Sequence, residues 1–152
     1  MPGSDVGVND MAGQIDWDAW ARKVEAAVDM RSRGDWAGLF APGAHFADPA
    51  QSTGDLRAVA RGTRELFPDW NQEVTSIRGG DDWAFFEWIG RATYAPEGGG
   101  PGAGAAIEMH GATIVEVDAD GLVTSWRDYL DRKQPEEQIR RAARAAAKVG
   151  GA

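Results

Sequence analysis

The chain has 152 residues and is 43% hydrophobic, which is enough for one domain with a hydrophobic core. It contains no cysteine, which excludes disulfides, thiolate metal sites and cysteine nucleophiles and leaves packing as the source of stability. The formal net charge of -8 predicts a surface that repels phosphate backbones, so we expect no nucleic acid partner.

The N-terminal residues carry no recognisable targeting signal. Residues 1–13 lack the basic-then-apolar layout of a signal peptide, and no stretch approaches the roughly 20 apolar residues of a membrane-spanning helix. We therefore expect a soluble, cytoplasmic protein with no membrane partner. Residues 1–14 mix Gly, Asp, Asn and Ser without periodicity, which predicts a disordered leader.

The first half of the sequence predicts two amphipathic helices. One begins after the N-cap residue Asp16, carries apolar residues at helical spacing and ends at Gly34. A short helical turn over residues 36–40 and a short strand over residues 44–48 follow. The second helix covers residues 56–67, whose apolar positions share one face.

The second half changes to the two-residue period of β-strands. We expect four strands, over residues 72–79, 83–94, 105–117 and 122–131, and a hairpin turn at 118–121 joins the last two. Helices followed by an antiparallel meander indicate an α+β fold rather than a doubly wound sheet.

Two further segments stand apart from this meander. The glycine-rich residues 98–104 lie between two strands and predict a flexible loop or lid. Residues 135–148 predict a C-terminal helix with an apolar stripe for packing and a solvated basic face.

Side-chain alternation in two of the strands points to a candidate catalytic group. The even positions of the strand over residues 83–94 form an apolar face that must be buried. The same positions of the last strand place one carboxylate, Asp128, among apolar neighbours. A buried carboxylate either finds donors or takes up a proton at a higher pH than usual, and both outcomes suit a general acid or base. The alternatives are a structural ion pair with Arg22, Arg91 or Arg127, or a strand that faces the other way.

Two other residues are candidates whose placement the residues alone leave open. One hairpin register sets His110 directly opposite Asp128, whereas a two-residue turn directs it away. Asp48 precedes Pro49 and by local rules is a turn residue. The two histidines, His45 and His110, lie far apart without the spacing of metal ligands, so we expect no metal and no cofactor.

Two motifs, GLVTSWRDYLD over residues 121–131 and the segment over residues 39–54, carry a resemblance to a known family. They resemble the nuclear transport factor 2-like (NTF2-like) superfamily, whose small cone-shaped domains include ketosteroid isomerase, limonene-1,2-epoxide hydrolase and SnoaL-like polyketide cyclases. Residues 121–131, GLVTSWRDYLD, are similar to the last strand of the epoxide hydrolase, whose catalytic aspartate matches Asp128. This match implies the register in which His110 lines the pocket. Residues 39–54 are similar to the segment of the isomerase that carries its proton-shuttling aspartate, which matches Asp48.

The sequence departs from both enzymes at other catalytic positions. Trp88 and Gly90 match the Arg and second Asp of the epoxide hydrolase, and Val24 and Thr113 match the oxyanion donors of the isomerase. The resemblance therefore implies the SnoaL-like pattern, in which one acidic residue moves a proton on an aromatic or polycyclic substrate without metal or cofactor.

The resemblance implies an α+β fold in which a cone-shaped, curved antiparallel sheet wraps around N-terminal helices, with an extra C-terminal helix. We expect this domain over residues 15–133, with a helix and tail over 134–152, and a homodimer. Asp128 is the expected general base or acid, His110 its partner or an oxyanion donor, and Asp48 a second proton carrier. The expected substrate-binding residues are Trp20, Phe46, Phe86, Trp88, Tyr94, Ala112 and Trp126.

Three functions agree with these features. The first is a cofactor-independent isomerase, cyclase or dehydratase acting on an apolar, ring-bearing small molecule in an internal cavity. The second is a ligand-binding or dimeric interaction module without turnover. The third is an epoxide hydrolase with an altered catalytic set.

Overall fold

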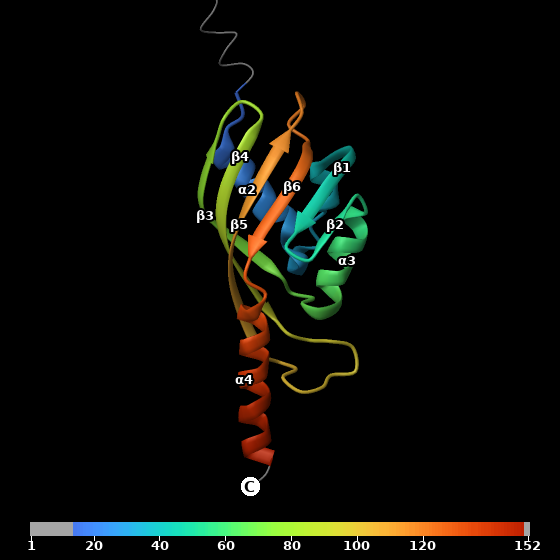
Figure 1. The fold of residues 1–152 in the computed structure, drawn as a ribbon, viewed down its shortest axis with the longest axis vertical. Coiled ribbons are helices and arrows are strands. Elements are labelled where there is room, and N and C mark those ends of the chain that lie inside the picture. Colours follow the sequence, from blue (N-terminus) through green and yellow to red (C-terminus); the bar gives the residue numbers. More distant parts are fainter. Residues whose placement is uncertain (1–13, 151–152) are drawn as a thin grey trace, which may run out of the picture.

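The computed structural model describes residues 14–150, and the predicted leader therefore lies outside them except for Gln14. The first half contains two α-helices, two short 3-10 turns and a pair of strands, and a four-stranded meander and a long helix follow (Figure 1). In chain order the elements are α2 (Trp17–Val28), η1 (Met30–Ser32), η2 (Ala37–Leu39), β1 (Phe40–Asp48), β2 (Gln51–Thr53), α3 (Leu56–Leu66), β3 (Asn71–Gly79), β4 (Trp83–Thr93), β5 (Ala106–Val117), β6 (Val123–Leu130) and α4 (Lys133–Gly150).

The six strands form one curved sheet in the order β2-β1-β6-β5-β4-β3. The antiparallel meander from β3 to β6 is confirmed, and its strand ends lie within about a residue of the predicted ones. The sheet is nevertheless mixed, because β1 pairs with β6 in parallel and with β2 in antiparallel fashion. Alternation within a strand predicts which side chains are buried but not which neighbour the strand joins.

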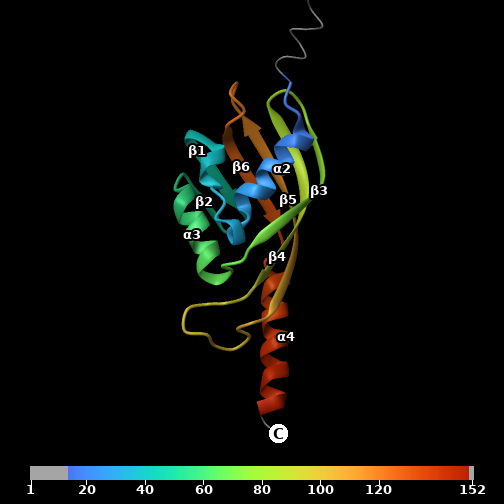
Figure 2. The ribbon, with the colours of Figure 1, turned by 180° about the vertical axis from the view of Figure 1, so that it is seen from behind.

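The helices take different positions around this sheet. The helix α2 crosses one face of the sheet, α3 lies beside the β1–β2 hairpin, and α4 extends beyond the end of β6 (Figures 1 and 2). The predicted N-cap is confirmed, since the Asp16 carboxylate accepts a hydrogen bond from the backbone N–H of Ala19. The helix ends at Val28 rather than at Gly34, because Asp29 caps the separate turn η1.

The predicted apolar face of β4 is confirmed and forms the centre of the core. Its even positions from Ala84 to Ala92 are all buried, and Phe86 is 0% exposed. Phe86 packs edge-on against Trp20 of α2 and Trp126 of β6, with ring centroids 5.9 and 5.5 Å away. These aromatic contacts fix the indole of Trp126 on the inner face of the sheet.

Two glutamines hold α4 against the sheet. The strand β5 continues beyond its pairing with β6, which leaves the backbone of Glu108 and His110 at an open edge. The amide of Gln134 accepts from the N–H of His110 and donates to its carbonyl, at 2.9 and 3.2 Å, and Gln138 does the same for Glu108, at 2.8 and 2.7 Å. One face of α4 therefore satisfies the sheet edge that β6 leaves free.

Candidate active site

A cavity of about 650 Å³ lies between the inner face of the sheet and the segments around α3. Volumes of this size hold drug-sized organic ligands. Aromatic side chains from the strands and from the segments next to η2 and α3 line this cavity. These residues are Trp36, Phe46, Phe67, Trp70, Trp88, Tyr94 and Trp126. Such walls favour a flat, apolar ring system.

Asp128 lies on the inner face of β6 and lines this cavity. Its Oδ1 accepts hydrogen bonds from the hydroxyl of Thr113, at 2.6 Å, and from the indole Nε1 of Trp126, at 2.7 Å. Within residues 14–150 no group donates to Oδ2. The carboxyl thus has one fixed oxygen and one that a ligand can reach.

Burial raises the pKa of the Asp128 carboxyl to about 6. The hydrogen bonds from Thr113 and Trp126 act in the opposite direction because they favour the charged form, and the nearby negative charge of Asp48 adds to the increase. The alternative in which Asp128 forms an ion pair with Arg22, Arg91 or Arg127 is wrong: its partners are neutral donors. A carboxyl with this pKa changes its charge close to neutral pH.

Asp48 lies at the end of β1, in the wall of the same cavity. Its Oδ1 accepts from the backbone N–H groups of Ala50 and Gln51, at 2.7 and 2.9 Å, which is the predicted turn role. Its Oδ2 lies 3.4 Å from the guanidinium of Arg132, and the side chain is 10% exposed. The structure therefore brings Asp48 near Asp128 but engages both of its oxygens.

His110 does not reach the cavity. In the observed register Thr113 lies opposite Asp128, so the register implied by the resemblance is wrong. His110 points to the outer face of the sheet, where its side chain is 61% exposed and lies 3.5 Å from Glu108. The buried neighbours Met109 and Thr113 occupy the inner positions of β5 instead. The structure thus excludes the predicted pairing of Asp128 with His110.

Four of the seven predicted substrate-binding residues line the cavity: Phe46, Trp88, Tyr94 and Trp126. Phe86 and Trp20 belong to the core behind the cavity wall, because α2 covers that part of the sheet. Ala112 faces outward, since it pairs with the exposed Tyr129.

Several lining residues escaped the sequence analysis. Trp36 and Trp70 lie outside the helices and strands and carry no periodic signal, although the apolar face of α3, which supplies Val59 and Thr63, was recognised. Gln72 on β3 is also in the wall, and its Oε1 is buried without a hydrogen-bond donor. Buried polar atoms are normally paired, which makes this amide available to a ligand hydroxyl.

Charged side chains line the cavity at α3 and at the junction of β6 and α4. They are Arg57, Arg64, Arg132 and Glu136. In the described part of the chain no group of three histidine, aspartate or glutamate residues has the geometry to hold a metal ion. No helix between residues 14 and 150 has the length and apolar character needed to cross a membrane.

Three solved structures share this fold. AclR from Streptomyces galilaeus, a candidate hydroxylase, matches with a TM-score of 0.68 at 19% identity, over 82% of this chain and 95% of AclR. IdmH from Streptomyces antibioticus, a candidate polyketide cyclase, matches with a TM-score of 0.68 at 20% identity, over 82% and 99% of the two chains. An LEH-like epoxide hydrolase from M. tuberculosis matches with a TM-score of 0.60 at 19% identity, over 87% and 96%.

No curated protein sequence matches the chain significantly. The SnoaL-like domain family, in contrast, matches residues 20–126, which run from α2 to the inner-face Trp126 of β6. The matched span contains strands β1 to β5, the first half of β6 and most of the cavity wall, and it ends two residues before Asp128. The chain therefore belongs to the SnoaL-like domain family.

Proposed function

We propose that this protein is a cofactor-independent acid/base enzyme, an isomerase, cyclase or dehydratase, that acts on an apolar, ring-bearing small molecule. The observation that carries the proposal is the position of Asp128, whose carboxyl has one free oxygen in an aromatic cavity and a pKa raised to about 6 by burial. General acid/base catalysis is most efficient when the pKa of the group lies near the working pH.

The proposed reaction uses the ionised form of Asp128, which predominates at neutral pH. Its Oδ2 takes a proton from an acidic C–H bond beside a ligand carbonyl, and the electron pair of that bond moves onto the carbonyl oxygen. Asp128 then returns the proton to another atom of the ligand or of its product, so the enzyme recovers its starting state without an oxidant or reductant. The role of Asp48 as a second proton carrier stays a prediction.

The cavity supports the proposed ligand class. Its indole and phenyl walls provide broad apolar contact, and a small number of polar groups can orient the ligand. The unpaired amide of Gln72 lies on β3 and Asp128 on β6, which are separated by two strands of the sheet. The two groups therefore lie at separate places in the cavity wall, which suits a ligand with polar groups at both ends.

Proton transfer can be tested before the natural substrate is known. Ring-bearing ketones and polyketide-like phenols that quench the tryptophan fluorescence would be incubated with the protein in D2O, and deuterium uptake at carbon would be followed by mass spectrometry. The proposal expects uptake that depends on the protein. Binding without uptake would support a ligand-binding module. In a separate incubation with ring-bearing epoxides in oxygen-18 water, a diol carrying one labelled oxygen would support epoxide hydrolysis.

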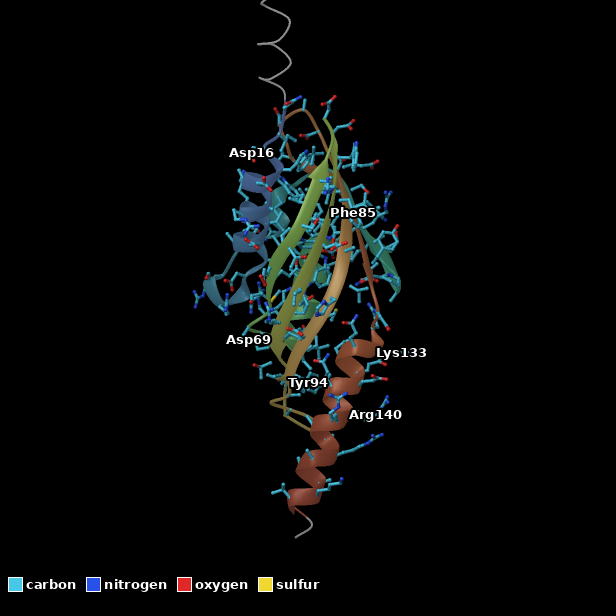
Figure 3. The ribbon with its side chains drawn as sticks, turned by 90° about the vertical axis from the view of Figure 1, so that its left-hand side faces the viewer. Asp16, Asp69, Phe85, Tyr94, Lys133 and Arg140 are labelled. Carbon is cyan, nitrogen blue, oxygen red and sulfur yellow. The ribbon has the colours of Figure 1, made fainter. Side chains whose placement is uncertain are left out.

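We also propose that two copies associate through the outer face of the sheet. Phe85 of β4 and Tyr129 of β6 are 37% and 53% exposed on this face, and Figure 3 shows Phe85 on the side away from α2. Large exposed apolar groups on a sheet face favour an interface. Light scattering should give the mass of a dimer for the wild type and that of a monomer for Y129E/F85E, whereas a monomeric wild type would contradict this part of the proposal.

A further inference from the structure

A chain of hydrogen bonds that begins at Trp88 ends on Asp128. The indole Nε1 of Trp88 donates to the hydroxyl oxygen of Thr113 at 2.9 Å, and that hydroxyl donates to Oδ1 of Asp128 at 2.6 Å. The indole of Trp126 donates to the same Oδ1. Thr113 is 0% exposed, so the loss of either bond would leave a buried polar group without its partner.

The direction of this chain follows from the chemistry of its members. An indole N–H is a donor only, so the hydroxyl of Thr113 must act as the acceptor toward Trp88. Its own hydrogen is then left to point at Asp128. Trp126 supplies a second donor that likewise cannot accept. Oδ1 therefore faces two donor hydrogens, one from the Thr113 hydroxyl and one from the Trp126 indole. A proton bound to Oδ1 would collide with them.

We infer that Trp88 and Thr113 are positioning residues which, together with Trp126, keep Oδ1 of Asp128 as a permanent acceptor and leave Oδ2 as the oxygen that exchanges protons with a ligand. This inference rests on the proposed function for its catalytic meaning, but its geometry can be tested separately. An ionised carboxylate and a carboxylic acid protonated on Oδ2 both accept at Oδ1. The carboxyl can therefore change its charge without any movement of its neighbours, which is the arrangement that lowers the reorganisation of a catalytic site.

Other elements around the cavity bring charges toward this carboxyl but do not touch Oδ1. Asp48 comes from β1 and is paired with Arg132, which follows β6. Arg57 and Arg64 of α3 and Glu136 of α4 also line the cavity. Of these groups, Asp48 acts on the pKa of Asp128 through space, whereas the two donors to Oδ1 act through direct bonds, so single substitutions can separate the two influences.

The replacement Thr113→Val keeps the size of the side chain and removes the hydroxyl. Loss of one donor to the charged form should raise the pKa of Asp128 by about one pH unit, followed by the carboxyl carbon-13 signal. At low pH the infrared carbonyl band of protonated Asp128 should move to higher wavenumber, because its carbonyl oxygen, Oδ1, has lost a hydrogen bond. Thr113→Ser retains a hydroxyl and should restore both values.

The matched control is Thr124→Val, which alters an exposed threonine of β6 whose hydroxyl bonds to the carbonyl of Glu116. It should leave the pKa and the band unchanged. If Thr113→Val lowers the stability too far, Trp126→Phe removes the other donor and should shift both readouts in the same direction. An unchanged carbonyl band in both variants would overturn the inference, because the proton would then reside on Oδ1.

Neither readout needs a substrate, so the inference and the proposed function can fail separately. If the band and pKa respond as expected while no ligand exchanges protons, the positioning chain stands and catalysis does not. If exchange occurs and both readouts ignore Thr113, the function stands and the assignment of Oδ2 is wrong.

Discussion

Asp128→Asn should lower the rate of deuterium uptake into a bound ligand by about 100-fold or more, the usual contribution of a general acid or base. The asparagine side chain keeps the shape of the aspartate, and its Oδ1 can still accept from Thr113 and Trp126. Its amide cannot take up a proton near neutral pH. The variant therefore removes the proposed chemistry while leaving the cavity and ligand affinity close to those of the wild type.

Asp131→Asn is the matched control for this loss. Asp131 follows β6 three residues after Asp128, and its carboxylate accepts from the backbone N–H of Lys133 at the start of α4, a bond that asparagine can also make. The control should keep the rate within about threefold of the wild type, well inside the 100-fold effect. A loss of less than about tenfold in Asp128→Asn would show that another group moves the proton.

The substitution Asp128→Asn should also change the free energy of unfolding, in a direction that the pKa of Asp128 predicts. The pKa of Asp128 is about 6 in the folded protein and near 4 in the unfolded chain, so the folded state holds the proton more tightly. Ionisation therefore costs the folded state roughly 3 kcal/mol as the pH rises from 4 to 6, and the cost persists at higher pH. Asp128→Asn should be more stable than the wild type at pH 8 and lose this advantage at pH 4.

Phe86→Ala should lower the free energy of unfolding by about 3–5 kcal/mol, the range found when a buried phenyl ring is removed from a core. Phe86 is 0% exposed and packs between the indoles of Trp20 and Trp126. Removal of the Phe86 ring leaves a cavity next to Trp126, the residue whose indole donates to Asp128. Urea denaturation followed by tryptophan fluorescence measures the change.

Phe85→Ala provides a comparison within the same strand. Phe85 is the preceding residue, has the same side chain and points to the opposite face, where it is 37% exposed. Measured on the monomer, its removal should cost less than about 1 kcal/mol, because exposed side chains contribute little. Similar losses for the two variants would mean that the faces of β4 are not assigned correctly.

The strands of the meander could be predicted because their alternation is nearly complete. In β4 every even position from Ala84 to Ala92 is buried, and in β5 the positions of Met109, Thr113 and Val115 are also buried. The residues alone left the face of His110 open, and the resemblance to the epoxide hydrolase, which implied an inward side chain, was wrong. The buried set of β5, which includes Met109, Thr113 and Val115, fixes the face of the strand and directs His110 outward.

The register between β5 and β6 depends on details of the turn that composition does not reveal. Asp118 accepts from the N–H groups of Asp120 and Leu122, Gly121 has a φ of 79°, and a bulge with Thr124 as the extra residue lies on β6 opposite Glu116 and Val117. This bulge puts Val123 in the core and turns Thr124 outward, against simple alternation. The cavity was equally hard to foresee in full, since Trp36 and Trp70 reach it from irregular segments.

The parallel pairing of β1 was another feature beyond the sequence. A strand was predicted over residues 44–48, whereas the observed strand begins at Phe40 and includes Pro42 and Gly43, with a shift in register between Phe40 and His45. Strand β2 has three residues and none of them is buried, so it carried no hydrophobic signal. Both segments matter for the site, because their junction places Asp48 in the cavity wall.

The most direct measurement is a carbon-13 NMR titration of the side-chain carboxyl of Asp128 in the wild-type protein, assigned by comparison with Asp128→Asn. A midpoint near pH 6 is expected, because burial of the Asp128 carboxyl raises its pKa and the hydrogen bonds that oppose this increase reach only one of its oxygens, Oδ1. A midpoint at or below about pH 4, the ordinary value for an aspartate, would mean that this group stays ionised at all physiological pH values and would contradict its role as the proton carrier.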